Sequence, residues 1–183
     1  MSIGSFVDAT DASQLNGDSL YEIIDGHFVE TPPMSALANK LANRLARQLN
    51  ACVWPNDGEA FVEMLFHLPL PVDRNRRPDV AYVSFQRWAK DREMPSANAW
   101  DVVPNLISEI ASPTDLVEET MEKIDEYFRS GVQLVWVVYP TQRLVQVCES
   151  MKSWRVLAED EVLDGGNVLP QFRLPLKDFF ISK

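Results

Sequence analysis

Residues 105–139, with the sequence NLISEIASPTDLVEETMEKIDEYFRSGVQLVWVVY, decide the fold of the chain. The first seven, NLISEIA, form a short apolar strand that Glu109 interrupts. Ser112-Pro113-Thr114-Asp115 should end this strand and begin a helix, because proline suits a first helical turn and serine or aspartate a helix cap. The helix is expected to end near Gly131, since glycine commonly follows the last turn of a helix. VQLVWVVY then predicts a fully buried strand.

The segments nearer the N-terminus predict a hairpin and a first helix. LYEIIDGHFVE (20–30) places Asp25-Gly26 between two short apolar runs, which is typical of a two-residue hairpin turn. Leucines at steps of four from residue 37 to residue 49 predict an amphipathic helix. Residues 87–103 are expected to be irregular, with Trp88 and Trp100 anchoring this loop to the core rather than stacking on a base.

The remaining segments complete a sheet. Strands are expected at 59–68 and 79–84, and later in RLVQVCE, SWRVLAE and the strand-rich end VLPQFRLPLKDFF. The pattern predicts an α/β (α+β) fold, in which a mixed β-sheet is flanked by helices and carries an N-terminal hairpin and C-terminal strands. No repeat or linker divides the chain, so we expect one domain over 1–183, with 1–16 as a peripheral N-terminal segment.

Composition excludes several classes of protein. Apolar residues make up 46% and charged residues 24% of the chain, as in ordinary soluble domains. No stretch approaches the roughly 18 apolar residues of a membrane helix, and no signal peptide is evident, so we expect a cytoplasmic protein with reduced cysteines. The formal net charge of −10 argues against a protein that coats nucleic acid by charge alone, but not against an enzyme whose carboxylates hold metal ions.

Acidic residues within apolar strands are the most informative chemical feature. Asp79 opens the strand that follows Arg76-Arg77-Pro78, and Glu109 faces the same way as Ile107 because strand side chains alternate. Removing a carboxylate from water costs several kcal/mol, and two on neighbouring strand ends are economically explained by a divalent cation. The alternatives are an exposed turn aspartate and a glutamate paired with a core arginine.

Lys123 is a third candidate. It lies at the edge of the apolar face of the second helix and could deliver its ammonium over the end of the sheet. Alternatively it forms only a surface pair with Glu119, four residues earlier. The sequence holds no zinc spacing, no hydrolase triad context and no glycine-rich phosphate loop.

The order of the segments resembles the Uma family of bacterial putative restriction endonucleases, a branch of the PD-(D/E)XK nuclease superfamily. The resemblance runs from Leu20 to Phe180 through YEIIDGHFVETPP, RRPDVAYVS, NLISEIASPTD, EKIDEYFRSGVQLVWVVYP and LDGGNVLPQFRLPLKDFF. It implies a restriction-endonuclease-like core with a metal site at one edge of the sheet.

The resemblance also implies roles for individual residues. Pro78-Asp79 matches the PD element and Glu109 the acid of the second element, while Ala111 stands where the superfamily has its lysine. The catalytic residues would then be Asp79, Glu109 and Lys123. Ligands for Mg²⁺ or Mn²⁺ would be Asp79, Glu109, Glu22 and the carbonyl of Ile110. Contacts to the substrate would come from Arg44, Arg47 and Arg77.

The expected activity is that of a metal-dependent endonuclease that hydrolyses phosphodiester bonds of DNA. A homodimer is expected, because cutting both strands of a duplex usually needs two active sites. One departure from the family pattern is Ala38, at a position where relatives commonly carry histidine. That departure and the acidic net charge favour an alternative: a catalytically silent protein of the same fold that binds or assembles. An RNA or flap substrate fits the sequence equally well.

Overall fold

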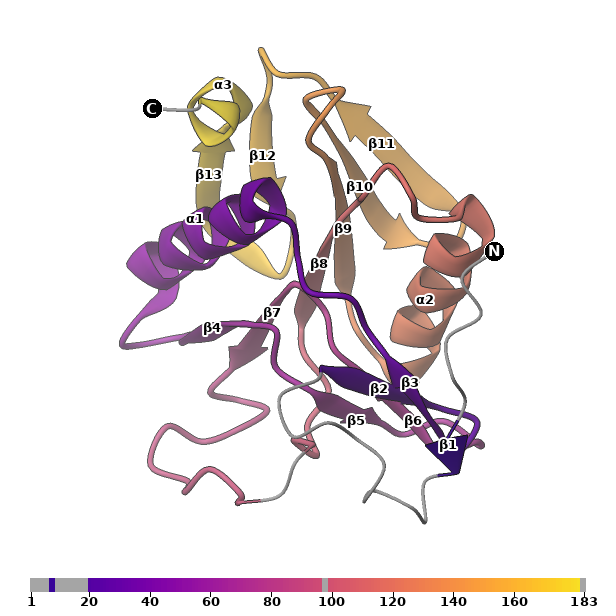
Figure 1. The fold of residues 1–183 in the computed structure, drawn as a ribbon. Coiled ribbons are helices and arrows are strands. Elements are labelled where there is room, and N and C mark those ends of the chain that lie inside the picture. The colour runs from indigo at the N-terminus through magenta and orange to yellow at the C-terminus, as the bar shows by residue number, and fades with distance from the viewer. Residues whose placement is uncertain (1–6, 9–19, 97–98, 182–183) are drawn as a thin grey trace.

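A computed structural model of the chain describes residues 7–8, 20–96 and 99–181 (Figure 1). Its centre is a six-stranded sheet in the order β11-β10-β9-β8-β7-β4. The strands are β4 (Gly58–Val62), β7 (Val80–Ser84), β8 (Leu106–Ile110), β9 (Leu134–Tyr139), β10 (Leu144–Ser150) and β11 (Ser153–Leu157). Only β8 and β9 are parallel within this sheet, so the chain needs a crossover between them, and a helix provides it.

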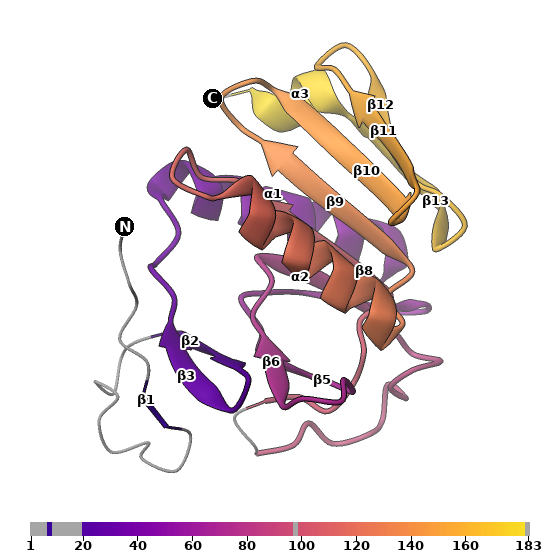
Figure 2. The ribbon, with the colours of Figure 1, turned by 90° about the vertical axis from the view of Figure 1, so that its right-hand side faces the viewer.

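Two helices cover opposite faces of the central sheet (Figures 1 and 2). Helix α1 (Ala36–Val53) packs on the face that carries Val80 and Leu106, and α2 (Val117–Ser130) on the face that carries Ala81 and Ile107. The alternation of side chains along each strand therefore divides the core into two layers. Among the described residues, no helix combines the length and apolar character needed to cross a bilayer.

A second sheet, a ribbon and a short helix surround this core. The second sheet has the order β1-β3-β2-β6-β5. Its strands are β1 (Val7–Asp8), β2 (Tyr21–Ile24), β3 (His27–Glu30), β5 (Phe66–Leu68) and β6 (Arg74–Arg76). The ribbon β12 (Val162–Gly165) and β13 (Leu169–Pro175), followed by α3 (Leu176–Phe180), packs in the same core layer as α1.

Most of the predicted elements are confirmed. The turn between β2 and β3 is Asp25-Gly26, and both residues have positive φ, 53° and 76°, as a tight two-residue hairpin requires. Helix α2 ends before Gly131, whose φ of 101° is the left-handed conformation typical of glycine after a helix. Of the predicted peripheral segment 1–16, only residues 7–8 are among those described, and they form β1.

Four local predictions are wrong. The strand predicted at 59–68 is two strands in different sheets, because the chain turns at Glu63, where φ is 51°. Strand β6 lies in the predicted loop before Asp79, because its polar sequence RNR conceals a buried strand. Helix α2 begins at Val117, later than expected, since the Asp115 carboxylate accepts from the Ser112 N–H instead of capping the helix. The last predicted strand residues form α3.

The tryptophans of the irregular segment anchor it to the core, as expected. Trp100 is 3% exposed, stacks on Phe66 and meets Phe61 and Trp88 edge to face. Its backbone N–H and carbonyl pair with Leu65 and His67. The segment is therefore fixed against β5 by aromatic packing, and the tryptophan rings pack on other aromatic side chains of the protein.

The core layer under α1 should carry much of the stability. We expect Leu45→Ala to lower the free energy of unfolding by about 2–5 kcal/mol, because Leu45 is 0% exposed and its removal leaves a cavity. Leu37→Ala on the same helix is the matched control, since Leu37 is 47% exposed. Urea unfolding of both variants measures the difference, and equal losses would contradict the assignment of this face to the core.

Candidate active site

Asp79 and Glu109 face each other across adjacent strands. Val80 on β7 pairs with Ser108 on β8 in antiparallel register, so the next position along each strand brings Asp79 opposite Glu109. Both side chains lie on the α2 face, as Ala81 and Ile107 do. The Ile110 N–H donates to Asp79 Oδ2 at 2.6 Å. Burial and then the neighbouring charge of Glu109 raise the pKa of Asp79 to about 7.

Glu109 is held from the helix side by Tyr127. The Tyr127 hydroxyl, fully buried on α2, donates to Glu109 Oε1. Burial raises the pKa of Glu109, while Lys123 and the Tyr127 hydrogen bond act in the opposite direction. Among the described residues, no hydrogen bond reaches Asp79 Oδ1 or Glu109 Oε2. Each carboxyl group thus has one oxygen fixed by the protein and one available.

Lys123 lies one helical turn before Tyr127 and on the same side of α2. Its Nζ is 3.6 Å from Glu22 Oε1 on β2, and its side chain is 28% exposed. Glu109 is the main reason that the pKa of Lys123 is raised, and Glu22 and Asp79 add to it against the effect of burial. The alternative of a surface pair with Glu119 is wrong, because the lysine turns inward to a strand of the second sheet.

Glu22 is buried and closely bound by its neighbours. Its side chain accepts from Arg76 Nη1 at 2.8 Å and from the Arg77 backbone N–H at 2.9 Å. Burial acts to raise the pKa of Glu22, but Lys123, Arg76 and the Arg77 N–H outweigh it, and the pKa is lowered. Both oxygens of Glu22 have partners, because Oε2 accepts from Arg76 and Oε1 accepts from the Arg77 N–H and lies 3.6 Å from Lys123 Nζ. A role of Glu22 as a metal ligand stays a prediction.

A buried charged network extends from Glu22 along β6, and the sequence analysis missed it. Arg76 Nε donates to Glu126 Oε2 at 2.6 Å, and Arg74 Nε lies 3.1 Å from Glu126 Oε1. Arg74 also donates to Asp25 at 2.9 Å. Three consecutive polar residues, RNR, are typical of a loop, and Glu126, which is 3% exposed, gave no sequence signal of burial because it lies opposite the predicted apolar stripe of the helix.

The three arginines predicted to contact substrate lie in different surroundings. Arg44 Nη1 donates to the carbonyls of Asp178, Phe179 and Ile181, so the guanidinium binds the end of α3. Arg47 is exposed on α1. Arg77 is close to Asp79 in the chain, and its guanidinium donates to the Glu63 carbonyl at 2.6 Å. Contact between these arginines and a substrate stays a prediction.

The donor set at the strand ends is suited to a small, hard cation. It comprises an available oxygen on Asp79, an available oxygen on Glu109 and the main-chain carbonyl at Ile110. Mg²⁺ is commonly held by one or two carboxylates and keeps waters or substrate phosphates as its other ligands. Among the described residues, no group of three or more His, Cys, Asp or Glu side chains is arranged to hold a metal ion. Because Asp79, Glu109 and the Ile110 carbonyl offer only oxygen donors and too few to fill a coordination shell, an ion held here would need water or substrate as its other ligands.

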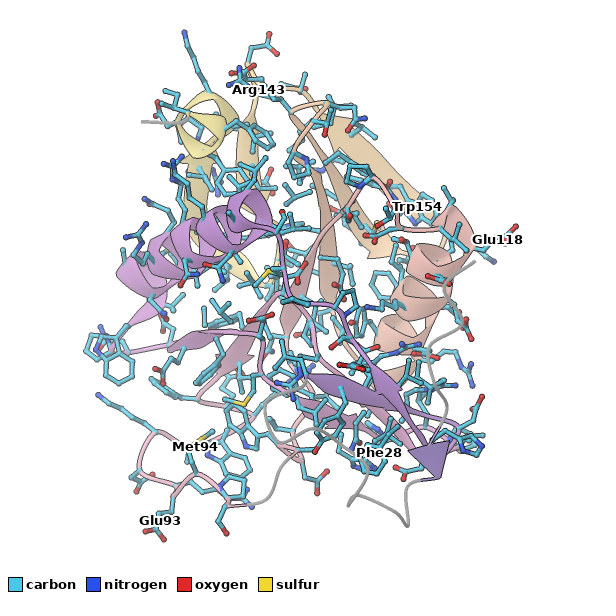
Figure 3. The ribbon with its side chains drawn as sticks, in the orientation of Figure 1. Phe28, Glu93, Met94, Glu118, Arg143 and Trp154 are labelled. Atoms are coloured by element: carbon cyan, nitrogen blue, oxygen red, sulfur yellow. The ribbon has the colours of Figure 1, made fainter. Side chains whose placement is uncertain are left out.

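Ala38, Ser112 and Thr114, named from the sequence, and Glu118 make no hydrogen bond or ion pair with Asp79, Glu109 or Lys123 among the described residues. Ala38, where relatives commonly carry histidine, is in the first turn of α1, and its N–H donates to the Ser35 hydroxyl. Ser112 and Thr114 hydrogen bond to each other in the exposed turn before α2. Figure 3 shows Glu118, also near the start of α2, directed away from the sheet.

Comparisons with known proteins identify a family for the chain and a solved structure with a similar fold. The Uma2 family model, described as putative restriction endonuclease, matches residues 8–177. A search of curated proteins found no match. Among solved structures, the crystal structure of a putative nuclease belonging to DUF820 from Anabaena variabilis ATCC 29413 superimposes with a TM-score of 0.79 and 20% sequence identity. The match covers 95% of this chain and 97% of that one, and confirms the fold class.

The raised pKa of the carboxyl pair should make the metal-free protein less stable at higher pH. The folded chain retains a proton on Asp79 up to about pH 7, whereas an unfolded aspartate releases it near 3.8. The resulting destabilisation is therefore absent below pH 4, grows as pH rises and is complete above pH 7. We expect Asp79→Asn to raise the free energy of unfolding at pH 8 by about 2 kcal/mol.

Urea unfolding in the presence of a chelator, at intervals from pH 4 to pH 8, measures this effect. The difference between Asp79→Asn and the parent protein should increase steadily with pH. Asp91→Asn is the control, because Asp91 is exposed in a loop. Parallel stability curves for Asp79→Asn and the parent would contradict the assignment of a raised pKa.

Proposed function

Because the chain belongs to the Uma2 family of putative restriction endonucleases, we propose that it is a metal-dependent endonuclease that hydrolyses phosphodiester bonds of DNA. The observation that supports this proposal is the arrangement of Asp79, Glu109 and Lys123. Two acids from adjacent strands and one amine from the crossover helix approach the same edge of the sheet. Such a set can hold a cation and a phosphate together.

In the proposed reaction, Asp79, Glu109 and the Ile110 carbonyl would hold one or two Mg²⁺ or Mn²⁺ ions. A divalent ion lowers the pKa of bound water and offsets negative charge in the transition state. The Ile110 N–H fixes the Asp79 carboxylate, and the Tyr127 hydroxyl fixes that of Glu109, so neither acid has to reorganise when substrate arrives.

Lys123 supplies positive charge to the substrate. Its ordinary pKa is already well above neutral and its environment raises it further, so the amine is protonated at neutral pH. A protonated amine cannot accept a proton from water. We therefore assign Lys123 to orienting the attacking water and stabilising charge on the phosphate oxygens rather than to general base catalysis.

The competing proposal is a catalytically silent protein of this fold. The net charge of −10 and Ala38 favour it. Two partly buried acids without a full set of partners cost stability, because each must be removed from water. That cost argues against the silent protein, which would gain nothing from the two acids. Metal binding distinguishes the two proposals, and the choice of nucleic acid in the assay distinguishes DNA from RNA or flap substrates. The homodimer stays a prediction, to be tested by the molar mass in solution.

Cleavage assays test the proposed catalytic residues. With supercoiled, linear and single-stranded DNA and with RNA in Mg²⁺ or Mn²⁺, we expect Asp79→Ala and Lys123→Ala to lose at least about 100-fold in rate. Asp79→Ala removes a ligand of the cation, and Lys123→Ala removes positive charge that stabilises the phosphate oxygens in the transition state. Lys152→Ala, in the exposed turn before β11, should keep the parent rate. Equal residual cleavage by all variants would identify a contaminant and overturn the assignment.

Calorimetric titration with Mn²⁺ tests the metal site without relying on activity. We expect the parent protein to bind in the micromolar-to-millimolar range and Glu109→Gln to bind at least about tenfold more weakly, since the variant loses a charged oxygen ligand. Glu118→Gln, on the outer side of α2, should bind as the parent does. No measurable binding by the parent protein would favour the silent alternative.

A further inference from the structure

Resting on this proposed function, we propose that Glu22 is a positioning residue that holds the Lys123 ammonium beside Asp79 and Glu109, and is not itself a metal ligand. The closest charged contact of Lys123 is Glu22, at 3.6 Å. Lysine has a flexible four-carbon stem, so a fixed partner is needed to keep its amine in one place. Glu22 is 2% exposed and is held by hydrogen bonds from Arg76 and the Arg77 N–H, which suits it to this role.

The oxygens of Glu22 are already satisfied. Oε2 accepts from Arg76 Nη1 at 2.8 Å, and Oε1 accepts from the Arg77 N–H at 2.9 Å and faces Lys123. A metal ligand at this position would have to give up contacts to the buried Arg76 and to the partly buried Lys123. Asp79 and Glu109 differ from it, because each retains an oxygen that no hydrogen bond reaches among the described residues.

The contacts form a closed ring between α2 and the second sheet. Lys123 pairs with Glu22, Glu22 with Arg76 and Arg76 with Glu126, and Glu126 lies one helical turn after Lys123. Two points of α2 are thus bound to β2 and β6. The ring fixes both the distance and the rotation of the helix that carries Lys123 and Tyr127.

Charge balance supports the same assignment. Within the network, the acids Asp25, Glu22 and Glu126 are matched by the cations Arg74, Arg76 and Lys123. Glu22 therefore belongs to a set that is neutral by itself. Asp79 and Glu109 are outside that balance, and they are the acids whose negative charge a divalent cation would compensate.

Mn²⁺ calorimetry separates the two roles of Glu22. If Glu22 positions Lys123, Glu22→Gln should bind Mn²⁺ within about threefold of the parent, whereas Glu109→Gln loses at least about tenfold. A loss in Glu22→Gln that matches the loss in Glu109→Gln would overturn the proposal and restore Glu22 as a ligand. This result is independent of whether the protein cleaves DNA.

A double-mutant cycle tests the action through Lys123. We expect Glu22→Gln to lower kcat about 10–100-fold with little change in KM, and to cost less than about twofold more in a Lys123→Met background. Independent, multiplicative losses would contradict the proposal.

If the protein proves inactive, NMR of the lysine ammonium groups replaces the kinetic readout. The Lys123 signal should be ordered in the parent and averaged in Glu22→Gln, and an unchanged signal would contradict the proposal.

Circular dichroism checks that each variant folds, and a conservative variant is available if one does not. If Glu22→Gln fails to fold, Glu22→Asp keeps the charge and withdraws it from Lys123 by one methylene. It should give the same separation of metal affinity from kcat. Glu118→Gln, which removes an exposed acid from α2, should leave Mn²⁺ affinity, kcat and the Lys123 signal unchanged.

Discussion

Asp79 and Glu109 stand opposite each other on antiparallel strands, partly removed from water, and their mutual repulsion is the constraint on which the rest of the site depends. The fold opposes that repulsion with fixed donors: the Ile110 N–H, the Tyr127 hydroxyl and the nearby Lys123 ammonium. These donors do not neutralise the pair completely, since the pKa of each acid stays raised. A surplus of negative charge at a sheet edge is what a cation-dependent phosphodiesterase requires.

The second sheet is as important to the site as the central one. No hydrogen bond or ion pair joins the described side chains of its strands to Asp79 or Glu109, but its β2 and β6 hold α2 through a buried charged network. Buried ion pairs of this kind add little to stability compared with apolar packing, because desolvation offsets the attraction. They do specify a unique arrangement, since removal of one partner leaves the other buried and unpaired.

Sequence patterns were sufficient for elements whose physics is local. The Asp25-Gly26 turn, the leucine stripe of α1 and the buried strand β9 each follow from residues close together in the chain. The pairing of Asp79 with Glu109 was anticipated only as two acids at strand ends. Strand β6 and the partners of Lys123 were missed, because a buried Arg-Asn-Arg strand is stable only when Glu22 and Glu126, from distant segments, reach it.

Helix α2 brings Lys123, from late in the chain, to Glu22, from near its beginning. Glu22 and Lys123 lie about one hundred positions apart in the sequence, and the hairpin that carries Glu22 leaves the ribosome long before α2 is made. A nascent chain lacks the amine until the helix emerges, and lacks the parallel partner of β8 until β9 follows. Synthesis therefore delays the assembly of the proposed site until most of the polypeptide is available, and a prematurely terminated product would lack it.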